Sequence, residues 1–247
     1  HKAKINSHPD SSKFINYYKE LVSISEYITS FSIPLWKKIN DFGEQNKTIV
    51  FEGAQGSMLD IDFGTYPYVT SSNTTSGQIF PGTGFGYRSN HKVLGITKAY
   101  STRVGAGPFP TELFDNIGEY LGDKGKEFGT VTKRKRRCGW FDSVLLRQTV
   151  KLNGITDIVL TKLDVLDELS EIKICIGYEI EGISYDYFPS EEYLFDKINP
   201  IYKTIQGWKE STGGINNIKN LPQNAIKYIR LLEELIEAEI SVVSTGP

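Results

Sequence analysis

The sequence predicts an α/β protein with a mostly parallel, twisted sheet and flanking helices. Two observations lead to this prediction. Short runs of β-type residues each end in a loop of glycines and hydrogen-bonding side chains, and segments with helical apolar spacing separate these runs. In open α/β sheets, ligands bind beyond the carboxyl ends of the strands. We therefore expect one ligand crevice, built from the loops Glu52–Gly56, Ser101–Gly107, Thr161–Asp164 and Ser244–Pro247.

The spacing of apolar residues places each element. The expected strands are Ile49–Phe51, Val93–Tyr100, Ile155–Leu160 and Ile240–Val243, with a hairpin of Ile172–Ile180 and Ile183–Tyr187. The expected helices are Phe14–Ile33, Trp36–Phe42, Phe109–Leu121, Trp140–Asn153 and one from Leu221-Pro222 to Ile236. Gly77–Gly86 and the segment from Pro189 to Trp208 are expected to be loops.

The chain shows neither an internal repeat nor an interdomain linker. We therefore expect residues 1–247 to form a single α/β domain. Within it, residues 1–48 would be a helical lead-in, and residues 49–247 would carry the nucleotide and substrate sites.

Composition argues against several classes of protein. The 28 Lys+Arg and 30 Asp+Glu give a net charge of −2, whereas a dedicated nucleic-acid binder is usually basic. Cys138 and Cys175 lack the spacing of a zinc site or a disulfide framework and suit a reducing compartment. No apolar stretch approaches a membrane span, and no signal peptide is visible. We expect a soluble cytoplasmic protein that binds neither nucleic acid nor membrane.

Asp164, in the loop Thr161–Asp164, gives the sharpest chemical signal. A guanine ring offers two adjacent donors that one carboxylate can accept, while the stem of Lys162 can lie along the base plane. Adenine would leave the carboxylate unpaired, which costs on the order of a few kcal/mol when it is buried. Lys162 and Asp164 could also be solvated residues at a strand end, and these four residues alone leave both interpretations open.

Lys133–Arg137 places five cations in a row between Gly129 and Gly139. Three interpretations are open: a nuclear-localisation or nucleic-acid patch, a solvated surface run, or an anion clamp. The flanking glycines and threonines favour a mobile loop that closes over carboxylates or phosphates.

Two further features carry no ligand chemistry in our interpretation. Gly122–Lys126 lacks the preceding strand and the spacing of a phosphate loop. Asp60 and Asp62 alternate on one strand-like segment, where a structural role is expected rather than paired acid–base work.

With these residues in view, the chain resembles adenylosuccinate synthetase, a family of GTP-dependent enzymes that join IMP and aspartate. The resemblance implies a P-loop-NTPase-like α/β fold that is incomplete at the N-terminus. The matching segments run in one order: Phe51–Gly56, Leu59–Asp62, Gly64–Pro67, Val69–Thr75, Lys98–Leu113, Thr161–Asp167, Leu221–Pro222 and Ser244–Pro247.

The resemblance implies a two-step ligase reaction in purine nucleotide (AMP) biosynthesis. The γ-phosphoryl group of GTP passes to the 6-oxygen of IMP, and the amine of L-aspartate then displaces it to give adenylosuccinate. GTP is thus a substrate, and Mg²⁺ neutralises phosphate charge. The implied partners are IMP, GTP and L-aspartate, and the family forms homodimers.

The resemblance also implies roles for individual residues. Gln55 is expected to hydrogen-bond the purine 6-position and is the catalytic residue carried over to this chain. No metal ligand is expected in this chain. The other IMP contacts are expected from Thr70, Val104, Gly105 and Arg134. The aspartate loop is expected to comprise Thr130, Val131, Thr132, Lys133, Arg134, Lys135 and Arg136. GTP contacts are expected from Arg136, Lys162, Leu163, Asp164, Ser244, Thr245 and Gly246.

The chain departs from the family in three ways. Val131 and Lys133 stand where the aspartate loop usually carries threonine and glycine. The family's phosphate loop, Gly-Asp-Glu-Gly-Lys-Gly-Lys, is absent, and with it the proposed base and Mg²⁺ ligand and, farther along, the proposed acid. The sequence begins at His1 and stops at the guanine loop. We therefore expect an internal and C-terminal fragment that lacks turnover alone.

Two other classes of function stay open. The first is a non-catalytic guanine-nucleotide binding module, although such a module needs neither the Gln55 loop nor the aspartate loop. The second is an RNA-binding protein that uses Lys133–Arg137. The near-neutral charge disfavours it, and strong, salt-sensitive RNA binding would support it.

Overall fold

The computed structural model describes residues 11–86, 91–129 and 134–246. They separate into two compact units, His1–Phe51 with Ile79–Gly86, and Glu52–Gln78 with Tyr87–Pro247. None of the helices in these ranges is long and apolar enough to cross a membrane.

The first unit is helical, with α2 (Ser11–Ser23), α3 (Ser25–Thr29), α4 (Leu35–Glu44) and α5 (Ile79–Thr83). α4 confirms the helix expected around Trp36–Phe42. The helix expected from Phe14 to Ile33 is interrupted at Ile24. The hydroxyls of Ser23 and Ser25 there donate to backbone carbonyls three residues earlier. Such local bonds compete with the helical backbone, which accounts for the break.

Two predictions for the first unit are wrong. Ile49–Phe51 is not a strand, because a strand needs a neighbour to bond to and no described segment pairs with it. Its aromatic ring packs instead, with 5.3 Å between the ring centroids of Phe51 and Phe85. Gly77–Gly86 is not all loop, since it contains α5. The rings of Phe80 and Phe85 stack at 6.5 Å, so aromatic packing supports a turn of helix despite the glycines.

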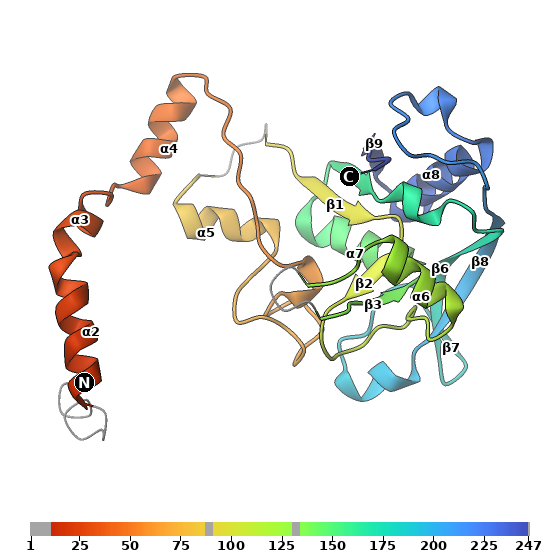
Figure 1. Cartoon of the computed structure of the whole chain (residues 1–247), viewed down its shortest axis with the longest axis horizontal. Helices are drawn as coiled ribbons and strands as arrows, with labels where there is room; N and C mark the ends of the chain where they lie inside the picture. Colours follow the sequence, from red (N-terminus) through yellow and green to blue (C-terminus); the bar gives the residue numbers. More distant parts are fainter. Residues whose placement is uncertain (1–10, 87–90, 130–133, 247) are drawn as a thin grey trace. The chain divides into compact units, whose positions relative to one another are not determined.

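The second unit is built on a parallel sheet in the order β1-β5-β9. Figure 1 labels its two outer strands, β1 and β9. β1 (Leu94–Lys98) pairs in parallel with β5 (Asp157–Thr161), and β5 pairs in parallel with β9 (Glu239–Val243). α7 (Ser143–Asn153) and α8 (Gln223–Ile236) supply the helices between these strands. The predicted α/β class with a parallel sheet and flanking helices is confirmed.

The two faces of this sheet differ because strand side chains alternate. Ile158 and Leu160 on β5 are fully buried in the core that includes α8. The hydroxyl of Tyr228 on α8 donates to the carbonyl of Ala99 at 2.6 Å, which ties the helix to the end of β1. On the other face, Ile96 is 75% exposed. The core therefore lies on the α8 side of the sheet.

A second sheet lies beside the first and contains β4 (Phe141–Asp142), β6 (Glu171–Ile180), β7 (Ile183–Tyr185) and β8 (Asn199–Gln206). The predicted hairpin is confirmed as β6 and β7. β8 was expected to be loop because it contains Pro200. Among the described strands it pairs only with β6, beside which it lies in Figure 1, and an edge strand of this kind tolerates proline.

Two helices begin later than their apolar spacing predicts. α6 (Asn116–Lys124) starts after Asp115, whose carboxylate accepts from the N–H groups of Ile117 and Gly118, both at 3.1 Å. α7 starts after Asp142, which accepts from the N–H of Leu145 at 3.0 Å. Aspartate at such positions satisfies donors that the helix leaves unpaired.

The remaining elements are short. β2 (Ser101–Arg103) and β3 (Arg137–Gly139) form an antiparallel pair. The 3₁₀ turns are η1 (Ser57–Leu59), η2 (Ser76–Gln78), η3 (Leu163–Leu166), η4 (Glu192–Lys197) and η5 (Ile218–Asn220).

Asp167 fixes the segment between β8 and α8. It is buried and accepts from the indole N–H of Trp208 at 2.7 Å and from the backbone N–H and hydroxyl of Thr212 at 2.8 and 2.9 Å. Because this long connection has little regular structure, we infer that these three bonds hold it against η3.

We predict that Asp167→Asn lowers the free energy of unfolding by about 1–3 kcal/mol, because the amide nitrogen cannot accept from the N–H of Thr212. Urea unfolding followed by circular dichroism measures this change. Glu171→Gln, at an exposed position on β6, should stay within about 0.5 kcal/mol of the wild type. Equal losses in the two variants would contradict the assigned role of Asp167.

Candidate functional site

The carboxyl ends of β1, β5 and β9 lie at one edge of the parallel sheet. Hydrogen bonds continue beyond the strands: the N–H of Ala99 donates to the carbonyl of Thr161 and the N–H of Ser244 to that of Leu160, both at 2.8 Å. The loops that follow these three strands are therefore held side by side. This is the edge at which open α/β sheets bind ligands.

Lys162–Asp164 and Ser244–Gly246 meet at this edge. The N–H of Leu163 donates to the carbonyl of Ser244 at 3.4 Å, and the N–H of Gly214 donates to that of Thr245 at 3.0 Å. Lys162 has a left-handed backbone (φ 59°), a conformation that is costly for a residue other than glycine and is concentrated at functional sites. The side chain of Leu163 is fully buried, so only its backbone could face a ligand.

The loop after β2 is shaped by a cation from the basic run. Arg137 donates through Nη1 to the carbonyls of Gly105 and Gly107 at 3.2 and 2.8 Å, and through Nε to Glu112 at 2.8 Å. Val104 is 59% exposed, and Gly105 has a positive φ of 77° with open space around it. Arg137 therefore has a structural role, and the predicted IMP residues Val104 and Gly105 face open space.

Residues 56–75 are organised around the buried carboxylate of Asp60. It accepts from four backbone N–H groups, those of Asp62, Phe63, Thr74 and Thr75. Burial alone would raise the pKa of Asp60, but these bonds outweigh it and lower the pKa to about 2. The structural role expected for Asp60 is confirmed.

Two predicted IMP residues lie in or beside this segment. Thr70 is half-buried, and its N–H donates to the carbonyl of Leu59 at 2.8 Å. Gln55 is exposed and has a left-handed backbone (φ 61°). The next residues, Gly56 and Ser57, bond to Thr74 and to Asn153 at the end of α7. The bond between Ser57 and Asn153 anchors the Gln55 loop to α7. The two loops predicted to contact guanine, Lys162–Asp164 and Ser244–Gly246, are the guanine-type loops, and they lie instead at the sheet edge.

The predicted aspartate loop falls partly outside the described residues, which exclude 130–133. Its two sides are bonded, with the N–H of Gly129 donating to the carbonyl of Arg134 and the N–H of Arg136 to that of Glu127, both at 2.8 Å. Arg134 and Lys135 are exposed. Beside them, a cavity of about 330 Å³ is lined by Arg136, Arg137 and the start of α6.

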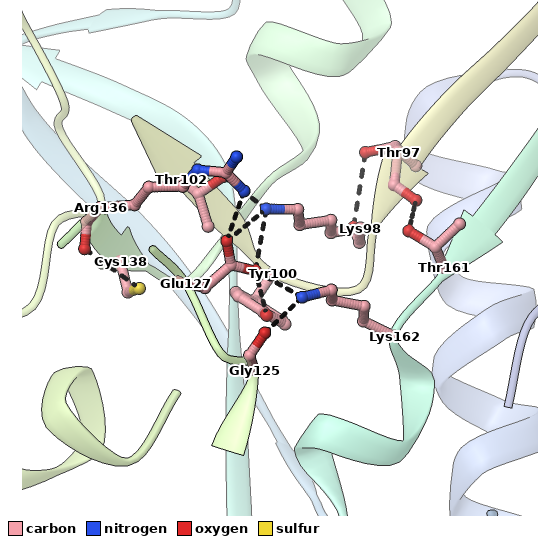
Figure 2. A network of polar contacts seen from close by, with 10 residues as sticks. All are labelled: Thr97, Lys98, Tyr100, Thr102, Gly125, Glu127, Arg136, Cys138, Thr161 and Lys162. Carbon is pink, nitrogen blue, oxygen red and sulfur yellow. Dashed lines mark hydrogen bonds and ion pairs between the residues drawn. The ribbon is translucent and has the colours of Figure 1, made fainter. Parts of the chain in front are cut away.

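Glu127 lies at the centre of a buried ionic cluster (Figure 2). Its carboxylate receives Lys98 Nζ at 2.8 Å, Arg136 Nη1 at 2.9 Å and Lys162 Nζ at 3.0 Å. The hydroxyl of Tyr100 also donates to it, at 2.6 Å. The cluster thus joins three segments: the end of β1 through Lys98, the aspartate-loop segment (Arg134–Arg136) through Arg136, and the guanine-type loop Lys162–Asp164 through Lys162.

The electrostatics of the cluster follow from one anion among three cations. Burial alone would raise the pKa of Glu127, but the bonds from Lys98, Tyr100 and Arg136 outweigh it and lower the pKa to about 2. Burial lowers the pKa of Lys98 despite its ion pair, and the cations Arg136 and Lys162 lower it further. One carboxylate cannot offset three cations, so the cluster itself carries an excess of positive charge.

The sequence had not pointed to Glu127, Lys98 or Tyr100 as parts of the site. Glu127 lies in a loop without a recognisable motif. Its partners, Lys98, Arg136 and Lys162, are 9 to 35 positions away in the sequence. The available signal was that Arg136 and Lys162 were both expected to contact GTP, since neighbouring buried cations require a counter-ion.

The fold and the site define an α/β protein whose ligand-type loops follow the carboxyl ends of parallel strands. The sequence profile of the adenylosuccinate synthetase family matches residues 1–247. The chain belongs to the adenylosuccinate synthetase family.

Individual relatives agree with this assignment. The chain is 54% identical over 232 residues to an adenylosuccinate synthetase of Ehrlichia canis (strain Jake), covering 94% of this chain and 54% of the relative. The structure of fully ligated adenylosuccinate synthetase from Plasmodium falciparum matches with a TM-score of 0.89 and 41% identity, over 98% of this chain and 57% of that one. The chain thus spans little more than half the length of these relatives.

A more distant structure shares the fold alone. The succinoaminodeoxyadenylate synthetase of cyanophage S-2L, bound to dGMP and dATP, matches with a TM-score of 0.51 and 19% identity. The match covers 85% of this chain and 47% of that one.

We predict that Glu127 makes the unfolding equilibrium sensitive to acid. Its pKa is about 2 in the folded chain and near 4.5 when unfolded, so its contribution is complete above pH 4.5 and is lost as the pH falls from 4.5 towards 2. The wild type should therefore lose its advantage over Glu127→Gln across this window, by about 3 kcal/mol. Urea unfolding at several pH values measures this difference.

Glu179→Gln, at an exposed position on β6, is the matched control for this titration. A difference between the wild type and Glu127→Gln that stays constant from pH 7 to pH 2.5 would show that the carboxylate is not stabilised by the three cations.

Proposed function

We propose that this chain supplies the purine, aspartate and guanine contacts of an adenylosuccinate synthetase, the GTP-dependent ligase that joins IMP and L-aspartate in AMP biosynthesis. The observation that carries the proposal is the side-by-side placement of Lys162–Asp164 and Ser244–Gly246 at the sheet edge. Membership in the family supports the ligase over a guanine-nucleotide binding module that lacks catalysis.

The guanine contacts follow from donor and acceptor chemistry. Asp164 is half-buried at the start of η3, so its carboxylate has a fixed backbone and is partly shielded from water. It can accept from the ring N–H and the exocyclic amine of guanine, neither of which adenine presents at those positions. Ser244, Thr245 and Gly246 would approach the base from β9, and the stem of Lys162 would lie along it.

The substrate contacts would come from the remaining loops. In this proposal Gln55 bonds the purine 6-position and Thr70 contacts the IMP phosphate, while Val104, Gly105 and Arg134 line the IMP site. The segment Thr130–Arg136 would bind the carboxylates of L-aspartate, and Arg136 would also approach GTP. The excess positive charge around Glu127 supports the binding of anions at this edge.

Phosphoryl transfer in this family uses Mg²⁺, which stabilises the charge of the transferred phosphate. Among the residues that the structure describes, no group of three or more His, Cys, Asp or Glu side chains could hold a metal ion. We propose that the described residues bind and orient GTP, IMP and aspartate.

The other hypotheses receive less support. Arg136 and Arg137 are ion-paired with Glu127 and Glu112, an arrangement that does not favour an RNA-binding patch. The homodimer and the cytoplasmic location that the resemblance implies stay predictions.

We predict that the 247-residue chain binds GDP and not ADP, and that Asp164→Asn loses GDP binding by about 100-fold because the amide cannot accept both guanine donors. The same variant should gain affinity for xanthosine diphosphate, whose 2-oxygen can accept from the new amide. Isothermal titration calorimetry with the three nucleotides measures these affinities.

The gain of xanthosine diphosphate binding distinguishes a changed specificity from a damaged fold. Asp62→Asn, an exposed aspartate outside the proposed guanine site, is the control and should bind GDP as the wild type does. A folded wild-type chain that binds ADP as tightly as GDP would contradict the proposed guanine site.

A further inference from the structure

Glu127 contacts cations from three segments that are far apart in the sequence (Figure 2). Lys98 ends β1, Arg136 is the last residue of the predicted aspartate loop, and Lys162 begins the guanine-type loop. Lys162 Nζ also donates to the carbonyl of Gly125, two residues before Glu127. A single carboxylate thus connects Lys162, which the proposed function assigns to guanine, with Arg136, which it assigns to both aspartate and GTP.

The cluster depends on the charge of Glu127. Three cations that share one carboxylate lie close enough to repel each other, and this repulsion is strong where water is excluded. Glu127 is fully buried, and the Nε–H of Arg136 is buried without an acceptor in the described structure. Without the carboxylate, Lys162 and Arg136 would separate towards solvent.

The segments that carry these cations are otherwise well held. The backbone N–H of Arg136 donates to the carbonyl of Glu127, and the residues around Lys162 are bonded to Ser244, directly after β9. The backbone thus places the two side chains within reach of one another, and the carboxylate determines where their charged ends point.

We propose that Glu127 is a positioning residue that holds Lys162 and Arg136 in their binding orientations and thereby links the guanine-type loop to the aspartate-loop segment. The ligands named here rest on the proposed function. Glu127 itself touches no ligand in this proposal and acts through the two cations. By linkage, a nucleotide that engages Lys162 would change the affinity of the aspartate-loop segment for its ligand. That ligand, bound at Arg136, would change the nucleotide affinity by the same factor.

The first test is a thermodynamic cycle on stability, which needs no ligand. In the wild type, Lys162→Met and Arg136→Met should each lower the midpoint of thermal unfolding, because each removes an ion pair with Glu127. In the Glu127→Gln background the same substitutions should raise the midpoint, since each then removes a repelling cation. Substitutions that lower the midpoint equally in both backgrounds would overturn the proposal.

The second test is GDP affinity by calorimetry on the 247-residue chain. Glu127→Gln should weaken GDP binding about tenfold by releasing Lys162, and its effect should be smaller in a Lys162→Met background. Lys197→Met is the control, because it removes an exposed ammonium that pairs with Glu181 and leaves every contact of Glu127 in place. It should bind GDP within about twofold of the wild type.

The outcomes separate the two proposals. Additive effects of Glu127→Gln and Lys162→Met on GDP affinity, or an equal loss in Lys197→Met, would overturn the positioning role. A folded wild-type chain that shows the reversal in stability but binds no GDP would support the positioning role and refute the proposed guanine site.

Discussion

Parallel alignment of β1, β5 and β9 is the constraint on which the site depends. Because these strands run in one direction, their carboxyl ends share an edge and the loops after them are neighbours. The alternation of strand side chains then buries Ile158 and Leu160 against the core that includes α8. The apolar core fixes the sheet, and the sheet fixes which loops can act together.

Buried carboxylates give these loops their shape. Asp60 organises residues 56–75, Asp167 holds the connection before α8, and Glu127 collects cations from three segments. Each occupies a region with little regular structure, where backbone donors or charged side chains would otherwise lack partners. Burial of a carboxylate is costly unless it is paired, so each arrangement tolerates little rearrangement.

Local sequence patterns predicted the strands and helices whose formation follows from the spacing of apolar residues. The strands β1, β5 and β9, the hairpin of β6 and β7, and α8 follow from apolar spacing alone. Helix starts shifted by a few residues where Asp115 and Asp142 act as caps. β8 escaped prediction because Pro200 resembles a loop residue until its place at a sheet edge is known, and Ile49–Phe51 resembles a strand although no described neighbour pairs with it.

The residues of the candidate site likewise fall into those that the sequence could identify and those that it could not. Asp164 and its neighbours could be identified from hydrogen-bonding chemistry, and the resemblance supplied the other loops. Glu127 could not be identified, because its role arises from Lys98, Arg136 and Lys162 meeting in three dimensions. Lys133–Arg137 appeared uniform in sequence, yet Arg137 supports the loop at Gly105 while Arg136 belongs to the cluster.

The most direct measurement of the central claim is the amide NMR spectrum of the isotope-labelled chain during a titration with GDP. We predict that the largest shifts fall together on Lys162–Asp164 and Ser244–Gly246, since both loops would surround one base. Shifts confined to only one of these loops, or to Gly122–Lys126, in a folded chain would contradict a single guanine site at the edge of the parallel sheet.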